Sequence, residues 1–482
     1  MKVTFVDAPA LVGTRVVERV FGCTYSHYPF PNVFVLSCAA VLRQKGHNVA
    51  YVDAAAAGWS RERFIEYVRG DTQSDAHCIY GVNLSKANDL ATLRVLRSCF
   101  GPEHPVIFLG PGPTWAPEDY LADGACAVVR GEPEHSLAEW IDHLGGSAPS
   151  HDVAGVSFLS DGGVVHNVER ALVDDLDALP LPARDLLDRD LYFNPKLGGA
   201  PFTAMLTSRN CPYQCIYCVP NSLSFARELE HKRWHNGAKP PVRLRSAAGV
   251  VQEFEHLHRG GYRAVSIIDD QFLWRAERTR QICDGIRRLD MEWGCLARVD
   301  HIHDEVVAAM ASAGCQYIDI GIESFNQDTL DFVRKGASVR DAYRAVSTIK
   351  RHGISVKVNM LLGASPNESR HSILRNIRIV RELAPSAVMF SIVSPFPGTE
   401  FHRMAVEQGW LAQGEYRPVD VQRQSILSYP GVGARELEAI AHRANLTFYL
   451  MPGFFWRNLK RVKSLRAVWR GVRSLWRKLS VV

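Results

Sequence analysis

The sequence lacks any long apolar run. Nowhere in its 482 residues do about 18 apolar residues follow one another, the length that a helix needs to cross a bilayer. The first residues also lack the uninterrupted apolar core of a signal peptide, because Asp7 and Pro9 interrupt the only candidate stretch. We therefore expect no membrane span and predict a cytoplasmic protein, in which thiols stay reduced.

The chain lacks a large net charge, but charge is concentrated at one end. The formal net charge is +5, yet residues 457–482 carry nine Lys or Arg and no acid, so the rest of the chain is mildly acidic. If residues 457–482 form a helix, their apolar side chains lie mainly on one face and the basic ones opposite. This pattern indicates peripheral contact with an anionic membrane surface. A terminal helix packed on the core is the alternative, and nucleic-acid binding is the least favoured.

Cysteine is scarce, and three of its 11 copies are crowded together. Cys211, Cys215 and Cys218 lie in "RNCPYQCIYC", residues 209–218, whereas the other eight are scattered singly, as is typical of small buried hydrophobes. A closed zinc site needs four ligands, usually in two pairs, and the sequence has no second Cys-x-x-Cys pair. Three thiolates suit a [4Fe–4S] cluster with one iron left open for a substrate group. A structural zinc site with a distant fourth ligand is the alternative.

The spacing of apolar segments predicts an α/β protein with two main domains. Residues 1–150 alternate short strands and helices, which predicts a doubly wound, flavodoxin-like sheet. Residues 151–199 are interpreted as a hairpin followed by a linker. Six strand–helix units in residues 200–410 predict a partial (β/α)6 barrel, and we expect residues 411–482 to be a helical region ending in the basic tail.

Polar residues collect where the predicted barrel strands end. Cys211 follows the first strand, Asp269 and Asp270 end the second, Arg298 ends the third and Glu323 ends the fourth. Active sites of parallel barrels lie at the C-terminal ends of the strands. These side chains therefore form one candidate site.

The cysteine spacing resembles the radical S-adenosylmethionine (SAM) superfamily, whose hallmark is Cys-x-x-x-Cys-x-x-Cys with an aromatic residue before the last cysteine. Here that residue is Tyr217. "IIDDQF" (residues 267–272) resembles the second-strand motif of the family, "GIES" (residues 321–324) its fourth-strand SAM contact, and "SPFPGTEF" (residues 394–401) a late Pro-Gly-Thr signature.

The resemblance implies that the open iron binds the amino and carboxylate groups of SAM. Reductive cleavage of SAM to methionine and a 5′-deoxyadenosyl radical would follow, with a flavodoxin or ferredoxin as electron donor. The implied cofactor contacts are Tyr217, Asp269, Asp270, Arg298, Glu323 and Ser324.

The first domain resembles the cobalamin-binding domains that are fused to radical SAM barrels. "FLGPGPTWAPEDYL" (residues 108–121) is similar to their GG-P-T-x-x-P-E pattern, and "VVRGEPE" (residues 128–134) to the pattern that follows it. The resemblance implies cobalamin contacts at Gly110, Gly112, Thr114 and Glu118, the two glycines by admitting a flat corrin close to the backbone.

One departure concerns the cobalt ligand. The Asp-x-His-x-x-Gly loop that supplies a histidine in many cobalamin domains is absent after the first strand. His77 is interpreted as structural, so we expect no protein histidine on the lower face of the corrin.

The combined resemblance implies a C-methyltransferase, because the cofactors carry the difficult chemistry. The deoxyadenosyl radical would remove hydrogen from an unactivated carbon, and methylcobalamin would supply the methyl group. A cyclising or rearranging enzyme like the anaerobic magnesium-protoporphyrin ester cyclase is the alternative, and a non-catalytic tetrapyrrole- or membrane-binding module is a third. The basic tail favours a lipid-like, tetrapyrrole or natural-product substrate.

Overall fold

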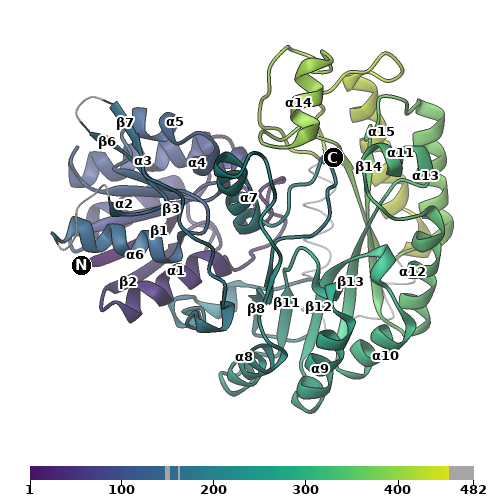
Figure 1. Cartoon of the computed structure of the whole chain (residues 1–482), viewed down its shortest axis with the longest axis horizontal. Helices are drawn as coiled ribbons and strands as arrows, with labels where there is room; N and C mark the ends of the chain where they lie inside the picture. Colours follow the sequence, from purple (N-terminus) through teal and green to yellow (C-terminus); the bar gives the residue numbers. More distant parts are fainter. Residues whose placement is uncertain (147–151, 161–162, 455–482) are drawn as a thin grey trace. The chain divides into compact units, whose positions relative to one another are not determined.

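The computed structural model of the chain describes residues 1–146, 152–160 and 163–454. It contains two compact units, of which the first holds Met1–Tyr192 and Pro220–Arg245 and the second holds Phe193–Val219 and the chain from Ser246 on (Figure 1). Within the described residues, no helix combines the length and the hydropathy needed to span a bilayer. The basic segment 457–482 lies outside the described residues.

The first unit is built on a seven-stranded sheet with the order β2-β1-β3-β4-β5-β6-β7. Strands β1 to β5 pair in parallel, in the doubly wound order predicted from the sequence. The β6–β7 hairpin joins antiparallel at the β5 edge, so it extends this sheet instead of standing apart as part of a linker. The strand bounds are Lys2–Asp7, Asn48–Asp53, Ala76–Tyr80, Val106–Leu109, Ala127–Val129, Val156–Ser160 and Gly163–His166.

Helices cover both faces of this sheet, since α1 packs beside α6 and α2 packs beside α3. Two of them begin at a capping side chain, Asn32 for α1 and Ser60 for α2. The segment after β4, expected to be a loop, contains two short helices. The bounds of α1 to α6 are Val33–Gln44, Arg61–Gly70, Lys86–Phe100, Pro111–Trp115, Pro117–Ala122 and Pro133–Leu144.

Helix α7 (Ser222–Trp234) belongs to the first unit, although the sequence placed it in the barrel. All of its residues from Ser222 to Glu230 are buried. Several of these are polar or charged, so no apolar stripe marks the buried face. The first unit therefore reaches Tyr192 without a break and also takes up Pro220–Arg245, in place of the expected boundary at residue 150.

The second unit contains six parallel strands in the order β15-β14-β13-β12-β11-β8, as a partial barrel requires. Their bounds, from β8 and β11 to β15, are Phe202–Met205, Ala264–Ile267, Glu292–Arg298, Cys315–Glu323, Ser355–Leu362 and Ala387–Ile392. Two-residue strands, β9 (Ser208–Arg209) and β10 (Arg243–Leu244), lie on either side of α7 in the chain.

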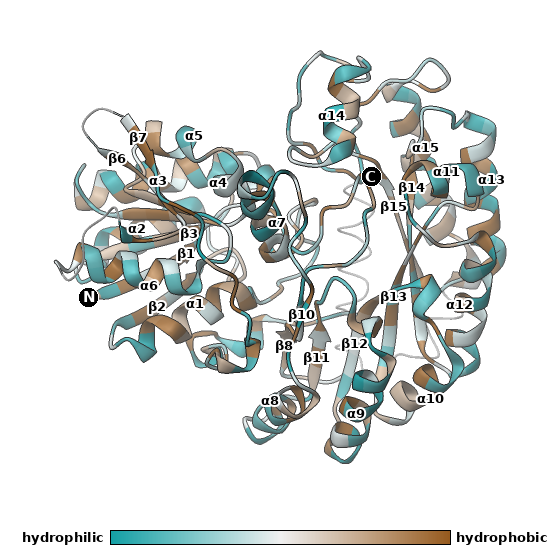
Figure 2. Cartoon of the chain, viewed as in Figure 1, coloured by the Kyte–Doolittle hydropathy of each residue, from teal (hydrophilic) through white to brown (hydrophobic). Residues whose placement is uncertain are grey.

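The outer helices of the second unit are amphipathic. In α12 the buried residues include Ala342, Ala345, Val346 and Ile349, at the spacing of one helix face, and α12 and α13 show both hydropathy colours in Figure 2. The bounds of α8 to α14 are Ala247–Arg259, Ala276–Ile286, Asp304–Ser312, Gln327–Phe332, Val339–Arg351, Arg370–Leu383 and Glu400–Glu407.

The region after residue 410 is only partly helical. Residues 411–433 contain no helix, and α15 (Ala434–Tyr449) packs on β15. Because the Tyr449 hydroxyl donates to the Val388 carbonyl, this helix is part of the core of the second unit.

Candidate functional site

The three clustered cysteines lie on the loop after β9, and none of them forms a disulfide within the described part of the chain. Cys215 is buried, whereas Cys211 and Cys218 are half-buried. Ile216 fixes the middle of the loop, because its N–H donates to the Val333 carbonyl at 3.2 Å and its carbonyl accepts from the Phe401 N–H at 3.0 Å. The loop thus presents three sulfur atoms on an anchored backbone, a donor set that fits a [4Fe–4S] cluster.

A buried cation lies beside the second cysteine. The Arg298 Nη1 atom, at the end of β12, is 3.7 Å from the Cys215 sulfur. The guanidinium also pairs with Asp300 at 3.0 Å and covers the Tyr213 ring at 3.4 Å from its centroid. Burial acts to lower the pKa of Arg298, but Asp300 and Cys215 outweigh it and raise the pKa. A permanent positive charge therefore lies beside the cysteine loop.

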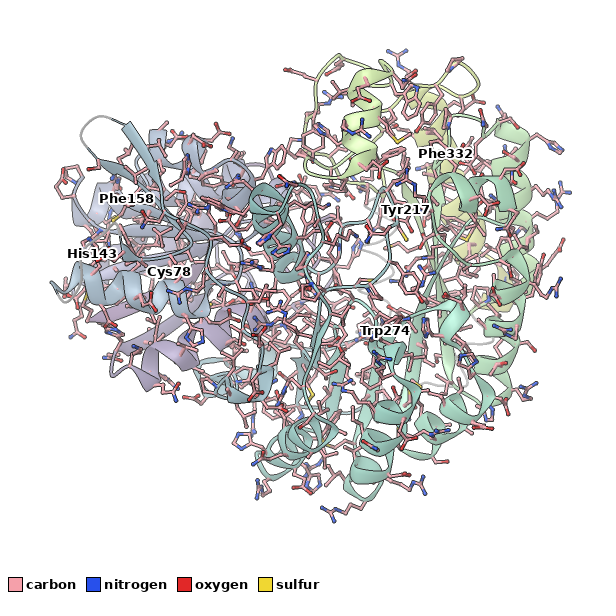
Figure 3. All side chains as sticks on the ribbon, viewed as in Figure 1. Cys78, His143, Phe158, Tyr217, Trp274 and Phe332 are labelled. Carbon is pink, nitrogen blue, oxygen red and sulfur yellow. The ribbon has the colours of Figure 1, made fainter. Side chains whose placement is uncertain are left out.

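A second buried ion pair lies at the end of β13. Lys335 Nζ is 2.8 Å from the Glu323 carboxylate, and both side chains are buried. The Tyr217 hydroxyl also hydrogen-bonds Glu323, and its pKa is raised well above the usual value by burial and then by the charges of Glu323, Cys215 and Cys218 (Figure 3). Tyr217 therefore connects the cysteine loop to the β13 carboxylate.

The carboxylate at the end of β11 has a positioning role. Asp269 is fully buried and accepts hydrogen bonds from the Thr207 N–H at 2.6 Å and the Ser208 hydroxyl at 2.7 Å. It thereby ties β11 to the segment that leads into the cysteine loop. Asp270, next to it, is half-buried.

Ser324 is engaged inside the protein. Its hydroxyl accepts from the Asn376 amide at 2.9 Å and from the Asn326 N–H at 3.1 Å, and the residue is fully buried. These contacts hold the turn that follows Glu323.

Sequence reasoning missed an aromatic cluster around Arg298. The Tyr213 hydroxyl hydrogen-bonds His301 Nε2, and the Trp274 ring lies 5.7 Å from the His301 ring and 6.1 Å from the Tyr213 ring, centroid to centroid (Trp274 is labelled in Figure 3). Trp274 comes two residues after the "IIDDQF" motif, which is the signal that could have indicated it.

The loop after β4 in the first unit is packed tightly from behind. Gly110 has a φ of +101°, and a Cβ there would lie 2.4 Å from the Gly81 carbonyl oxygen. A Cβ at Gly112 would lie 3.0 Å from the Tyr120 hydroxyl. Both glycines thus allow this loop to pack closely against Gly81 and Tyr120 of the same unit. From the sequence alone, we expected the glycines to allow a corrin to approach the backbone.

Thr114 and Glu118 differ in their surroundings. Thr114 is fully buried, and its hydroxyl accepts from the Gly131 N–H at 3.2 Å, whereas Glu118 is exposed and pairs with His166 at 3.1 Å. The loop lies at the carboxyl end of a parallel strand, where doubly wound sheets bind ligands.

His77 lies near the start of β3, and its Nδ1 is 2.7 Å from His104 Nε2. Burial, and then His104, lower its pKa to about 3. Its place within the strand and this contact match the structural role expected of it.

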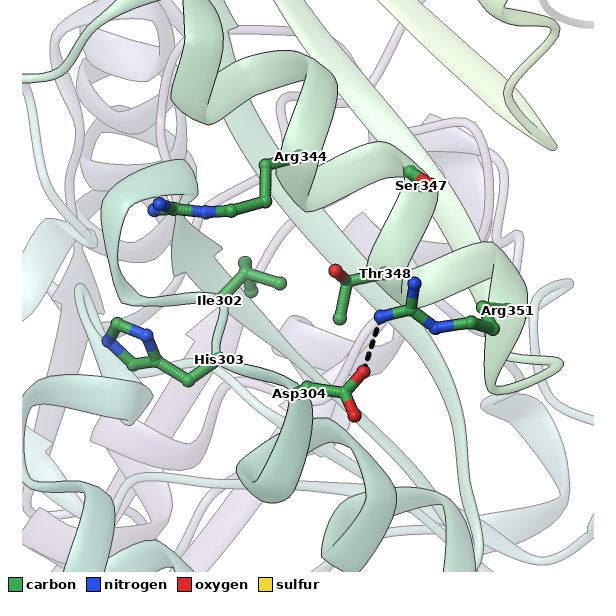
Figure 4. Close-up of a pocket in the computed structure, with 7 residues that line it drawn as sticks. All are labelled: Ile302, His303, Asp304, Arg344, Ser347, Thr348 and Arg351. Atoms are coloured by element: carbon green, nitrogen blue, oxygen red, sulfur yellow. Dashed lines mark hydrogen bonds and ion pairs between the residues drawn. The ribbon is translucent and has the colours of Figure 1, made fainter.

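A surface cavity of about 320 Å³ lies apart from the predicted site residues. It is lined by side chains of α12 and of the start of α10, including Arg344, Arg351, His303 and Asp304 (Figure 4). Since Arg351 is paired with Asp304 across it, we assign it no part in the chemistry.

Comparisons with known proteins agree with this geometry. Residues 205–379 match the radical SAM superfamily. The chain is 30% identical to the uncharacterized methyltransferase PH0819 of Pyrococcus horikoshii over 72% of each chain. It is 22% identical to cytidylyl-2-hydroxyethylphosphonate methyltransferase of Streptomyces wedmorensis over 85% of this chain and 84% of that protein. It is 25% identical to hopanoid C-3 methylase of Methylococcus capsulatus, over 80% of this chain and 70% of that protein.

Among solved structures, the radical SAM methyltransferase TsrM of Kitasatospora setae, with cobalamin and a [4Fe–4S] cluster bound, is similar in fold. The TM-score is 0.69 at 15% identity, with 100% of this chain and 99% of that chain covered. The chain therefore belongs to the radical SAM superfamily, and it shares the fold of a methyltransferase that was solved with cobalamin and a [4Fe–4S] cluster.

Proposed function

We propose that the protein is a cobalamin-dependent radical SAM methyltransferase that acts on an unactivated carbon. One observation carries this proposal: three clustered cysteines on an anchored loop, with Arg298 3.7 Å from the sulfur of Cys215. The names of the relatives support methyl transfer, since all three describe methylating enzymes.

In this proposal Cys211, Cys215 and Cys218 hold the cluster, and the first unit holds cobalamin at the loop after β4. The bound cluster and SAM supply a deoxyadenosyl radical, and cobalamin supplies the methyl group. The protein's part is to hold and orient the cofactors and to exclude water. Arg298 supplies a positive charge beside the cluster ligands, because Tyr213 and Asp300 keep its guanidinium next to Cys215.

Glu323 is the proposed acceptor for the ammonium group of SAM, with Asp270 and Arg298 as further contacts. Its carboxylate lies in the same hydrogen-bonded group as Tyr217 and therefore beside the cysteine loop. A carboxylate has about four acceptor sites, so it can accept from a ligand as well as from Lys335. Asp269 and Ser324 act in the proposal as positioning residues, since their polar atoms bind within the protein.

Gly110, Gly112, Thr114 and Glu118 form the proposed cobalamin platform. We propose that no protein histidine binds cobalt, because the chain after β1 reads Asp7, Ala8, Pro9 and His77 is engaged with His104. A reduced cobalamin complex should then show no nitrogen hyperfine splitting from a lower ligand. A strong nitrogen signal in the electron paramagnetic resonance spectrum would contradict this.

The substrate class and the partners remain proposals from the sequence. We propose a lipid-like, tetrapyrrole or natural-product substrate, and an electron donor of the flavodoxin or ferredoxin type. The support for a membrane-associated substrate is the charge and apolar pattern of residues 457–482.

The direct test is anaerobic reconstitution followed by reduction in the presence of SAM. The unsubstituted protein should hold one [4Fe–4S] cluster and release 5′-deoxyadenosine, and the Cys211→Ala, Cys215→Ala, Cys218→Ala triple variant should do neither. A matched control replaces the half-buried Cys23 and Cys99 by Ala, which should leave cluster and cleavage unchanged. Full cluster absorbance in the triple variant would refute the ligand assignment.

Product mass distinguishes methyl transfer from cyclisation or rearrangement. A deletion strain given isotope-labelled SAM and the restored gene should form a product that gains one labelled methyl group. A product that has lost hydrogen without gaining carbon would favour the cyclase alternative.

A further inference from the structure

Two histidines and a carboxylate converge at the C-terminal end of α7, outside the residues assigned to the cofactors. His231 and His235 are four residues apart, a spacing that places two side chains on the same face of a helix. Their rings stack with centroids 3.9 Å apart. Glu169, from the segment after β7, meets both. One of its oxygens is 3.1 Å from His231 Nδ1, and the other is 2.7 Å from His235 Nε2. His-x-x-x-His is a known spacing of metal ligands, and the sequence interpretation missed it.

We propose that Glu169, His231 and His235 bind one divalent transition-metal ion of the zinc class. One ligand atom from each residue lies within 4.8 Å of the others. Zinc lies about 2.0–2.1 Å from nitrogen and oxygen ligands, so neighbouring ligands in a tetrahedron are roughly 3.3 Å apart. The two distances to Glu169, 3.1 and 2.7 Å, involve its two different oxygens, so the side chains must rotate for one oxygen and both nitrogens to meet at a single ion. Two His and one Glu leave the fourth position for water.

Arg227 holds the carboxylate in place. Its Nη2 donates to Glu169 and lies 3.4 Å from His231 Nδ1, while its Nη1 donates to the Arg170 carbonyl at 3.1 Å. Outer hydrogen bonds of this kind orient ligands around a metal. The ligand set disfavours Mg²⁺ and Ca²⁺, because these ions depend on several oxygen ligands and the site offers two imidazoles and one carboxylate. Ions with high intrinsic affinity for imidazole remain.

The burial of the three side chains agrees with this assignment. The side chains of Glu169 and His231 are 11% and 12% exposed and that of His235 is 50% exposed, so the site is closed on one side and reached by water on the other.

The ion would join the segment after β7 to α7 within the first unit. α7 begins four residues after Cys218 in the chain. An ion that binds only the folded state stabilises it, so this site would brace the helix that follows the cysteine loop.

The test measures Zn²⁺ and Co²⁺ binding to the full chain in two preparations. The cysteine loop competes for the same ions, so one preparation is the Cys211→Ala, Cys215→Ala, Cys218→Ala variant and the other is the unsubstituted protein with its cluster reconstituted. Each should bind one Zn²⁺, and the Co²⁺ form should show visible bands without thiolate-to-cobalt charge transfer.

His231→Gln and Glu169→Gln should each lower the affinity at least about tenfold. The matched control is His256→Gln with His258→Gln, a surface histidine pair in α8 that has no place in the site, and it should bind Zn²⁺ as the parent does. His235→Gln, at the half-exposed ligand, provides a variant that is not expected to disturb the core.

Thermal melting separates lost ligands from lost folding. Without metal, His235→Gln and its parent should have the same Tm. Zn²⁺ should raise the Tm of the parent but not that of the variant. The proposal is overturned if neither preparation binds the ion, if thiolate bands persist in the cysteine-free variant, or if His231→Gln and His235→Gln retain the parent's affinity.

Discussion

Glu323 is constrained in both its backbone and its side chain, which the motif "GIES" (residues 321–324) does not reveal. Its backbone lies in the left-handed region, with a φ of +68°, a conformation that costs a residue other than glycine of order 1–3 kcal/mol. A Cβ at Gly321 would lie 2.3 Å from its carboxylate, so only glycine leaves room there. Lys335 and Tyr217 hold the side chain in place. Such strain at the end of a barrel strand is typical of a functional position.

Gly110 should tolerate a methyl group poorly. Gly110→Ala adds a steric clash with the Gly81 carbonyl to the strain of a positive φ, so it should destabilise the protein by about 2–4 kcal/mol. Gly46→Ala is the control, because Gly46 has a φ of +88° and open space around its Cβ position. It should cost about 1 kcal/mol. Urea denaturation midpoints of the two variants measure the difference, and equal shifts would contradict the steric argument.

The pH dependence of stability should include a contribution from Asp53. Burial, and then the charge of Asp7, raise its pKa to about 7, while the Tyr192 hydroxyl and the Ala56 N–H donate to it. The folded state holds this proton more tightly than the unfolded chain. The contribution is therefore fully present below about pH 4 and is lost as the pH rises to about 7.

Asp53→Asn should remove that dependence. Between about pH 4 and pH 7 the Tm of the unsubstituted protein should fall relative to that of the variant, because only the former must release a proton. Thermal melts in matched buffers measure the Tm difference between the two proteins. Glu368, whose pKa is also raised to about 7, contributes equally to both proteins, so its effect cancels in this difference. A constant difference across this range would refute the assignment.

At the scale of elements, α7 shows how charges hold a helix that apolar burial does not explain. Glu230 and Arg130 form an ion pair at 3.0 Å with both side chains fully buried, and Arg233 donates to the Thr114 carbonyl at 3.1 Å. The Ser222 hydroxyl donates to the Arg19 carbonyl at 2.7 Å. These contacts join α7 to the loop after β4 and to the β1–α1 connection, all within the first unit.

Arg130→Met should destabilise the protein by about 2–4 kcal/mol, since it leaves the buried Glu230 carboxylate with only the partly exposed Arg233, at 3.2 Å, as a cationic partner. Arg280→Met removes the exposed pair with Glu277 in α9 and should cost at most about 1 kcal/mol. Chemical denaturation compares the two free energies. Similar losses for both variants would show that the buried pair does not anchor α7.

At the scale of the whole molecule, one chain segment is shared between two cores. The second unit supplies the cysteine loop, the chain then enters the first unit for α7, and it returns at Ser246. The chain passes from one unit to the other on both sides of α7. The residues of α7 therefore pack in the first unit, although their neighbours in the sequence belong to the second.

Residues 457–482 should bind anionic vesicles. Deleting them should abolish binding, and Trp469→Ser with Trp476→Ser should weaken it even at low salt, because charge alone does not supply apolar insertion. Each basic residue near the surface contributes about 1 kcal/mol, so high salt should release the unsubstituted protein. Vesicle sedimentation measures binding, with neutral vesicles as the control.

The truncated protein should still cleave SAM, since the residues of the candidate site precede this segment. If truncation leaves vesicle binding unchanged but unfolds the protein, the segment is part of the core, and the support for a membrane-associated substrate is lost.

The sequence by itself determined the parts of the protein that depend on local pattern. The apolar periodicity predicted five parallel strands in the first unit and six in the second, because strands buried on both faces are short apolar runs. The cysteine spacing identified the loop and the family, because three ligands close in sequence need little of the fold to meet. Residues 411–433 have no such pattern, and the expectation of helix there was wrong.

Only the tertiary structure decided which residues meet across long stretches of chain. The buried polar face of α7 has no apolar stripe, so its place in the first unit depends on partners as distant as Arg130 and Glu169. The contact of Arg298 with Cys215 and the pairing of Glu323 with Lys335 arise because loop residues fold back onto the ends of β12 and β13. Charge pairing and close backbone approach are properties of three-dimensional neighbours, and spacing along a single sequence does not encode them.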